Sequence, residues 1–258
     1  MKIHFLGTCS GTEPMPNRHH TAIIIEVGDG LYWFDAGENC SYRAFLSGFD
    51  YSKIRALFIS HPHIDHIGGL PLLLFNLAKL NWRKKLRVGD DNILKMYLPD
   101  FEFLEGLKKM VNFERMKKGT DFDAKELLIH DGVIFEDAVI KVSAIHNGHL
   151  GEDGTNGWHS YSFLIEAEGK KVVYSGDVKS PHDYDCFTDK GCDVLIMETG
   201  HHKVTDVCDY ALEKKVKRLL FTHHGREILE NQQAAQQIID EKNVNATICY
   251  DGMTEIVE

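Results

Sequence analysis

Short apolar runs separated by turn-forming residues occur along most of the chain, a pattern typical of a protein rich in strands. Two pairs of runs are joined by short glycine-containing turns, and we expect each pair to form a hairpin. The pattern predicts strands at residues 1–7, 21–26, 31–34, 54–60, 96–98, 139–145, 161–166, 171–174, 194–197, 218–222 and 246–250.

Three longer segments, 68–80, 206–216 and 230–242, carry the pattern expected of helices. The first reads Gly-Gly-Leu-Pro-Leu-Leu-Leu-Phe-Asn-Leu-Ala-Lys-Leu, which is apolar enough to be largely buried. Its proline is compatible with a first helical turn. Because no tandem repeat and no linker rich in Pro and Ser interrupts the chain, we expect a single domain over residues 1–258.

The composition narrows the class of protein. Of the 258 residues, 43% are hydrophobic and 26% are charged, which is typical of a soluble globular chain. No apolar run reaches the roughly 18 residues of a membrane-spanning helix, and the N-terminus lacks the pattern of a signal peptide. None of the six cysteines forms a Cys-x-x-Cys pair, which argues against a zinc ribbon or a disulfide scaffold. We therefore expect a cytoplasmic protein without membrane contact.

The charge is unevenly distributed. A net charge of −10, from 29 basic and 39 acidic residues, disfavours a broad surface for a polyanion. Residues 83–118 are the exception, because ten Lys and Arg against six Asp and Glu give this segment a charge of +4. Such a segment is more often a solvated helical face than a binding surface, but it is the one candidate for contact with nucleic acid.

The chain contains 15 histidines, several of them in tight groups, and this points to metal chemistry. The strongest motif is His-Pro-His-Ile-Asp-His, which begins at His61 directly after a predicted strand. His61 and His63 are two residues apart, so both can bind one ion. Asp65 and His66 come as the next helix starts and can bind a second ion. Imidazole together with carboxylate suits zinc, and also iron or manganese.

Other ligand-type residues follow other predicted strands, where a rigid sheet would hold them in an open cleft. His146 ends one strand and is the natural third ligand for the first ion. Asp177, in Ser-Gly-Asp, can bridge two ions because it is a carboxylate. His223 would complete the second site. A bridged pair of ions lowers the pKa of a shared water and holds the group under attack.

The order of these motifs resembles the metallo-β-lactamase superfamily of two-metal hydrolases. Residues 5–14, Phe-Leu-Gly-Thr-Cys-Ser-Gly-Thr-Glu-Pro, and residues 33–38, Trp-Phe-Asp-Ala-Gly-Glu, are similar to segments of ribonuclease Z, the tRNA 3′-end endonuclease. Residues 196–199, Ile-Met-Glu-Thr, are similar to its strand-end glutamate motif. The resemblance covers essentially the whole chain and implies an α+β fold, the four-layer αββα sandwich.

The resemblance also implies roles for individual residues. It assigns two divalent ions, zinc with manganese or iron as alternatives, to seven ligands: His61, His63 and His146 for one ion, Asp65, His66 and His223 for the other, and Asp177 as the bridge. Asp65 would also be the general base that orients the water. Glu198 would pair with a histidine, best matched by His202, that stabilises or protonates the leaving oxygen. The implied reaction is hydrolysis of a phosphodiester by a hydroxide that bridges the two ions.

Two features differ from ribonuclease Z. Only 31 positions separate His146 from Asp177, so the glycine-rich arm that grips tRNA in that family does not fit there. Residues 222–226 read Thr-His-His-Gly-Arg where the family has Thr-His-Phe-Ser. The substrate therefore stays open between an RNA 3′ end and a small molecule such as a cyclic phosphodiester, a lactone or a thioester. A metal-bound RNA-binding module without turnover is a further alternative, from outside the enzymes.

Four more residues are candidates for roles around the site. His20, His159 and His224 are candidates for contact with the substrate. Asp35 is expected to brace the metal-binding loop by hydrogen bonds, as metal ligands generally require. Many relatives are dimers, so a homodimer is a further expectation, although no sequence feature marks its surface.

Overall fold

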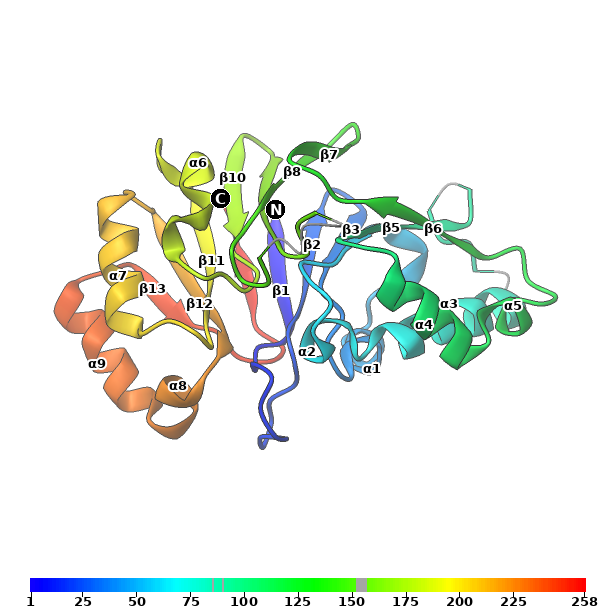
Figure 1. Ribbon diagram of the computed structural model, residues 1–258, viewed down its shortest axis with the longest axis horizontal. Helices are drawn as coiled ribbons and strands as arrows, with labels where there is room; N and C mark the ends of the chain where they lie inside the picture. The colour runs from blue at the N-terminus through cyan, green and yellow to red at the C-terminus, as the bar shows by residue number, and fades with distance from the viewer. Residues whose placement is uncertain (85, 90, 152–156) are drawn as a thin grey trace.

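The structure is a computed structural model that describes residues 1–84, 86–89, 91–151 and 157–258. Within this part of the chain, two mixed β-sheets of seven strands each form the centre of the molecule, and helices cover their outer faces (Figure 1). This arrangement confirms the predicted four-layer αββα sandwich of the α+β class. No helix among the described residues is long and apolar enough to cross a membrane.

The first sheet has the strand order β14-β1-β2-β3-β4-β5-β6. Its strands are β1 (Lys2–Gly7), β2 (Ala22–Val27), β3 (Gly30–Phe34), β4 (Ile54–Phe58), β5 (Ile93–Leu98), β6 (Asp123–Leu128) and β14 (Thr254–Ile256). Pairing is antiparallel from β14 to β3 and parallel from β3 to β6. The first expected hairpin is present as β2 and β3, with Ile25 opposite Tyr32.

The second sheet has the order β13-β12-β11-β10-β9-β8-β7. Its strands are β7 (Gly132–Glu136), β8 (Ile140–His146), β9 (Tyr161–Ala167), β10 (Lys170–Tyr174), β11 (Val194–Thr199), β12 (Arg218–His224) and β13 (Ala246–Ile248). Pairing is antiparallel from β7 to β10 and parallel from β10 to β13. The second expected hairpin is present as β9 and β10.

The helices lie on the two outer faces and in the loops at the sheet edges. They are α1 (Cys40–Leu46), α2 (Ile64–Ile67), α3 (Leu70–Lys84), α4 (Glu102–Val111), α5 (Phe113–Met116), α6 (Asp185–Thr188), α7 (Val204–Glu213), α8 (Arg226–Glu230) and α9 (Gln232–Lys242), with short 3-10 helices η1 (Tyr51–Lys53) and η2 (Pro181–Tyr184). The three predicted helices correspond to α3, α7 and α9, with ends that differ by a few residues.

Three apolar clusters separate the four layers. The central cluster lies between the sheets, where Phe34 of β3 packs edge-on against Phe163 of β9 with ring centroids 5.6 Å apart. A second cluster packs the first sheet against α3, and a third packs the second sheet against α7 and α9. Because each sheet is held on both faces, the loops at its strand ends are anchored to a rigid frame.

Candidate metal centre

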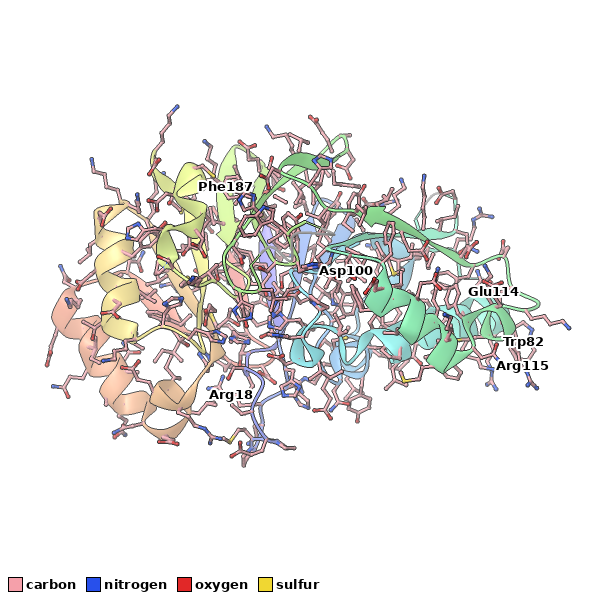
Figure 2. The ribbon with its side chains drawn as sticks, viewed as in Figure 1. Arg18, Trp82, Asp100, Glu114, Arg115 and Phe187 are labelled. Atoms are coloured by element: carbon pink, nitrogen blue, oxygen red, sulfur yellow. The ribbon has the colours of Figure 1, made fainter. Side chains whose placement is uncertain are left out.

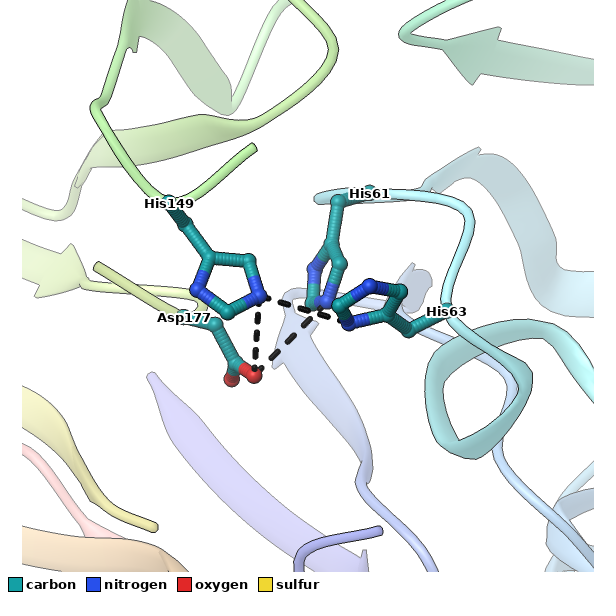
Figure 3. Close-up of side chains that lie close together, drawn as sticks. All are labelled: His61, His63, His149 and Asp177. Carbon is teal, nitrogen blue, oxygen red and sulfur yellow. Dashed lines mark hydrogen bonds and ion pairs between the residues drawn. The ribbon is translucent and has the colours of Figure 1, made fainter. Parts of the chain in front are cut away.

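One group of four side chains can hold a metal ion between the two sheets. His61 and His63 come from the loop after β4, His149 from the loop after β8, and Asp177 from the turn after β10. Each offers one ligand atom, and these atoms all lie within 4.8 Å of one another. The Nε2 atoms of His61 and His149 are each 3.7 Å from Oδ2 of Asp177 (Figure 3).

A second group lies directly beside the first. Asp65, His66 and His223 also place their ligand atoms within 4.8 Å of one another. The Nε2 atoms of His66 and His223 are each 3.3 Å from Oδ1 of Asp177. The two oxygens of Asp177 therefore face different groups, which suits a carboxylate that bridges two ions.

Unpaired buried atoms test whether these residues fit metal ions. His61 Nε2, His66 Nε2 and Asp177 Oδ1 are buried and make no hydrogen bond with any residue that the structure describes, although His66 and Asp177 approach each other closely. Buried polar atoms without a partner are rare because their desolvation is unfavourable. Three such atoms aimed at one another, from two imidazoles and a carboxylate, fit a cation bound among them.

Asp35, as expected, braces this loop. It follows β3 with a φ of 56° and is completely buried. Ser60 donates to it from its backbone nitrogen (2.7 Å) and its hydroxyl (2.8 Å), and Tyr174 donates from its hydroxyl (2.6 Å). His66 donates Nδ1–H to Asp35 Oδ2 at 2.8 Å. This bond keeps a proton on Nδ1, so Nε2 is the atom of His66 that would bind a metal ion.

The carboxylates give the centre a negative potential. Burial would lower the pKa of His223, but Asp177 and Asp65 outweigh burial and raise this pKa to about 9. Burial would likewise raise the pKa of Asp65, but the hydrogen bond from His223 and the charge of His66 hold it below its usual range. The carboxylates are therefore ionised at neutral pH and favour a bound cation.

His146 is not in the cluster, and this corrects the ligand set expected from the sequence. Its Nδ1 pairs with Asp131 Oδ2 at 2.7 Å, and its ring stacks on Trp158 with centroids 4.1 Å apart. The chain turns after β8 and brings His149 to the position expected of His146. The structure thus brings together six of the seven expected ligands and adds His149, which sequence reasoning missed.

The histidine that pairs with Glu198 near the metal cluster also differs from the one expected. The Nε2 atom of His202 lies 3.0 Å from the carbonyl oxygen of Val178 and 3.5 Å from Glu198 Oε1, and His202 belongs to none of the groups of metal-ligand candidates among the described residues. His201 instead places Nδ1 3.1 Å from Glu198 Oε1 and 3.7 Å from Asp177 Oδ2. The hydrogen bond to Glu198 is the main cause that raises the pKa of His201. His201, not His202, is therefore the histidine that faces the metal cluster.

The three histidines expected to contact substrate lie elsewhere. His224 is completely buried and donates Nε2–H to the carbonyl oxygen of Cys249 at 2.8 Å, so it cannot reach a substrate. His20 lies 3.3 Å from the carbonyl oxygen of Thr12, and His159 pairs with Asp100 at 3.1 Å. Neither His20 nor His159 is among the described residues that line the cavity over the metal cluster.

That cavity has a volume of about 330 Å³. Two loops and the start of α8 line it together with the metal-ligand candidates, and the lining includes Ser10, Gly11, Thr12, Gly200 and Arg226. Arg226 is half-exposed and forms an ion pair with Glu13. A group bound at the metals would therefore meet a guanidinium as well as His201.

Comparisons with known proteins agree with this arrangement. The profile of the family described as "Anti-Pycsar protein Apyc1" matches residues 1–243. Ribonuclease Z of Methanothermobacter thermautotrophicus is 30% identical in an alignment 279 positions long, gaps included, that covers 86% of this chain and 86% of that enzyme.

Solved structures show the same fold. Human tRNase Z, short form, superposes with a TM-score of 0.74 at 19% identity and covers all of both chains. The metallo-β-lactamase fold protein YhfI from Bacillus subtilis gives a TM-score of 0.74 at 18% identity, with 98% of both chains covered. At such identities the likeness concerns the fold alone.

Proposed function

Because the chain belongs to the family of the anti-Pycsar protein Apyc1, within the metallo-β-lactamase superfamily, we propose that it is a metal-dependent phosphodiesterase with two metal ions. The proposal rests mainly on Asp177, which lies between the two groups of ligand candidates. One of its oxygens faces His61 and His149, and the other faces His66 and His223. The similarity to ribonuclease Z supports a phosphodiester as the bond that is hydrolysed.

Two sets of side chains would bind the two ions. One ion would be bound by His61, His63 and His149, and the other ion would be bound by Asp65, His66 and His223. Asp177 would bind both ions. When bound, two divalent ions supply a water of lowered pKa and offset the negative charge of the phosphate oxygens. Asp65 lies 3.0 Å from His223 Nε2, and its oxygens border the cavity. It is placed to accept a hydrogen bond from a water and to orient it toward the phosphorus.

The leaving alcohol requires a proton, and His201 would donate it. Glu198 accepts from Nδ1 of His201 and from its backbone nitrogen (2.8 Å), which fixes the ring. Because the pKa of His201 is raised, its protonated form is more populated near neutral pH. Nε2–H of the imidazolium would then point at the oxygen that leaves. Glu198 acts through His201 and does not itself touch the substrate.

Two substrate classes remain as proposals. The similarity to ribonuclease Z favours an RNA 3′ end. The cavity of about 330 Å³ favours a small cyclic phosphodiester, because it is of the size of a small-molecule site. The short connection between β8 and β9 also leaves no room for a tRNA-binding arm among the residues between His146 and Asp177.

One experiment separates these alternatives. Zinc-reconstituted protein is assayed in single turnover on a 3′-extended tRNA precursor and in parallel on bis(p-nitrophenyl) phosphate. His63→Ala serves as the inactive variant, and His182→Ala, at an exposed histidine that pairs with Asp185, serves as the matched control. Cleavage of the precursor at its 3′ end supports the RNA substrate. Turnover of the small diester alone supports a small substrate.

The same experiment can refute the proposal. If metal-loaded protein hydrolyses neither diester, the phosphodiesterase proposal fails, and lactone and thioester substrates or a non-catalytic RNA-binding role take its place. If His63→Ala is as active as the control variant, the assigned metal cluster is not the site of reaction.

Three further properties are proposals of the same kind. Zinc is the favoured metal because the clusters are rich in imidazole, with manganese or iron as alternatives. A cytoplasmic location agrees with the six unpaired cysteines, because cytoplasm keeps thiols reduced.

A homodimer is supported by Tyr42, Phe45 and Leu46 of α1, which are large apolar side chains exposed at 60%, 56% and 62%. Light scattering on Phe45→Ser would show a monomer if this helix forms the interface.

A further inference from the structure

A second cavity, of about 400 Å³, opens between α3 and the segment that joins α4, α5 and β6. Its lining contains two aromatic rings, Phe75 and Trp82, and three cations, Lys79, Arg115 and Lys118. Figure 2 shows Trp82 and Arg115 at the right-hand end of the molecule, whereas Figure 1 places β10, β11 and β12 in the left half of the same view. The cavity shares no lining residue with the cavity over the metal cluster.

The aromatic wall comes from one face of α3. Phe75, Lys79 and Trp82 are separated by four and three residues, so they lie side by side on the helix. Lys79 Nζ is 5.4 Å from the ring centroids of both Phe75 and Trp82. The two rings are exposed at 41% and 57%. Exposed rings with a cation between them form a surface on which a planar aromatic group can stack.

The opposite wall is cationic. Among the described residues, no acidic residue lines the cavity. Neither Arg115 nor Lys118 forms an ion pair with a described residue. The neighbouring Lys117 differs, because it pairs with Asp123 and Glu114. In a chain with a net charge of −10, a pocket with three such cations is a local site of positive potential.

We propose that this cavity is a second binding site, for a phosphorylated nucleoside, either free or as one unit of a single-stranded nucleic acid. The base would stack on Trp82 and Phe75, and the phosphate would contact Arg115 and Lys118. The volume lies within the range of small-molecule sites, about 300 to 1,000 Å³. This site requires no metal and stands independently of the proposed phosphodiesterase activity.

The test uses the metal-loaded protein and a fluorescein-labelled octauridylate with phosphorothioate linkages, which resists hydrolysis. Binding is measured by fluorescence anisotropy for wild type, Trp82→Ala and the double variant Arg115→Gln/Lys118→Gln. The matched control is Lys53→Gln/Lys190→Gln, which removes two charges at exposed lysines outside the cavity. We expect affinity to fall about tenfold or more in both cavity variants, as for loss of one stacked base, and to stay unchanged in the control.

A second arm identifies the source of the ligand. Uridine monophosphate is titrated while tryptophan fluorescence is followed. Trp82 is exposed, whereas Trp33 is completely buried and Trp158 stacks on His146, and the variant Trp82→Phe isolates the contribution of Trp82. Saturable quenching that disappears in Trp82→Phe assigns the site to a free nucleotide. Binding of the octanucleotide without such quenching assigns it to a strand.

Two results would overturn the proposal. The first is that wild type and the cavity variants bind the oligonucleotide with equal affinity. The second is that Trp82→Ala abolishes self-association of the protein without weakening oligonucleotide binding. Turnover of bis(p-nitrophenyl) phosphate by the same variants is expected to equal that of wild type. A cavity variant that loses oligonucleotide binding but keeps turnover therefore reports on this second site alone. If wild-type protein does not hydrolyse the small diester, that result counts against the proposed phosphodiesterase activity and not against this site.

Discussion

The exchange of His146 for His149 makes a prediction that the sequence alone does not make. His149 Nε2 lies 3.3 Å from His63 Nδ1 and 3.7 Å from Asp177 Oδ2, and the side chain is only 11% exposed. Removing it deletes one imidazole from a group of four ligand candidates. Loss of a partner that merely orients a ligand lowers metal affinity by about 10- to 100-fold. We therefore expect His149→Ala to lower affinity for one ion by at least about 100-fold.

His146→Ala is the matched variant, because it deletes the same ring three residues away. Its imidazole pairs with Asp131 and stacks on Trp158, and its side chain is 34% exposed. The loss of a partly exposed pair costs about 1 kcal/mol or less. We expect metal affinity to change by less than about threefold, well short of the 10-fold effect of losing an orienting partner.

The assay is a zinc titration of chelator-treated protein in competition with a chromophoric chelator, together with metal analysis after desalting. Far-ultraviolet circular dichroism checks that each variant is folded. Wild type and His146→Ala should retain two equivalents of zinc, and His149→Ala should retain one. If His146→Ala loses an ion and His149→Ala does not, the assignment based on the geometry after β8 is refuted.

Three further predictions concern the frame around the site. Asp35→Asn should lower the free energy of unfolding by about 2 to 4 kcal/mol in urea denaturation, because buried donors lose an ionised acceptor, and should weaken zinc binding about 10- to 100-fold. Gly176→Ala should reduce zinc content, because φ is 56° and a Cβ would lie 2.9 Å from the carbonyl oxygen of Tyr161, whereas Gly48→Ala meets no atom within 4 Å and should retain zinc. Burial would raise the pKa of Asp185, but hydrogen bonds, first from Lys214, outweigh burial and lower this pKa. The ionised Asp185 therefore stabilises the folded protein above the pKa of the unfolded state, and this stabilisation is lost as the pH falls. Thermal unfolding of Asp185→Asn should therefore show a deficit at pH 7 that shrinks as the pH falls below the ordinary aspartate pKa of about 3.9.

The structure brings together the metal-ligand candidates that belong to one short sequence motif. His61, His63, Asp65 and His66 belong to one short motif, so their spacing alone brings them together. The position of His149 depends on contacts that are distant in sequence. Gly148 donates its backbone N–H to Asp183 at 3.0 Å and thereby directs the turn after β8. No local pattern reveals that contact.

The choice between His201 and His202 has the same cause. Both follow Glu198 closely, and both lie within 3.5 Å of its Oε1 atom. The carbonyl oxygen of Val178, from the segment after β10, accepts a hydrogen bond from His202, whereas His201 lies 3.7 Å from Asp177 Oδ2. The segment could be predicted from the sequence, but the side chain that faces the metals could not.

The strands that the sequence did not predict are those with the least apolar burial. β7 exposes three of its five residues, and β6 buries only one of its six. Their pairing is stabilised by neighbouring strands, which a pattern of apolar residues does not report. The buried strands β2, β3, β4 and β11 were predicted correctly because almost every residue in them is apolar and buried.

The contact between the two sheets is also part of the metal centre. Asp35 follows a strand of the first sheet, and Tyr174 ends a strand of the second, yet the Tyr174 hydroxyl donates to Asp35 Oδ2 at 2.6 Å. The same oxygen accepts from His66 Nδ1, so the position of this ligand depends on both sheets at once. The phenolic proton stays on Tyr174, because burial and then Asp35 raise its pKa well above the usual value. The precision of the centre therefore arises from the packing between the sheets as well as from the histidine motif.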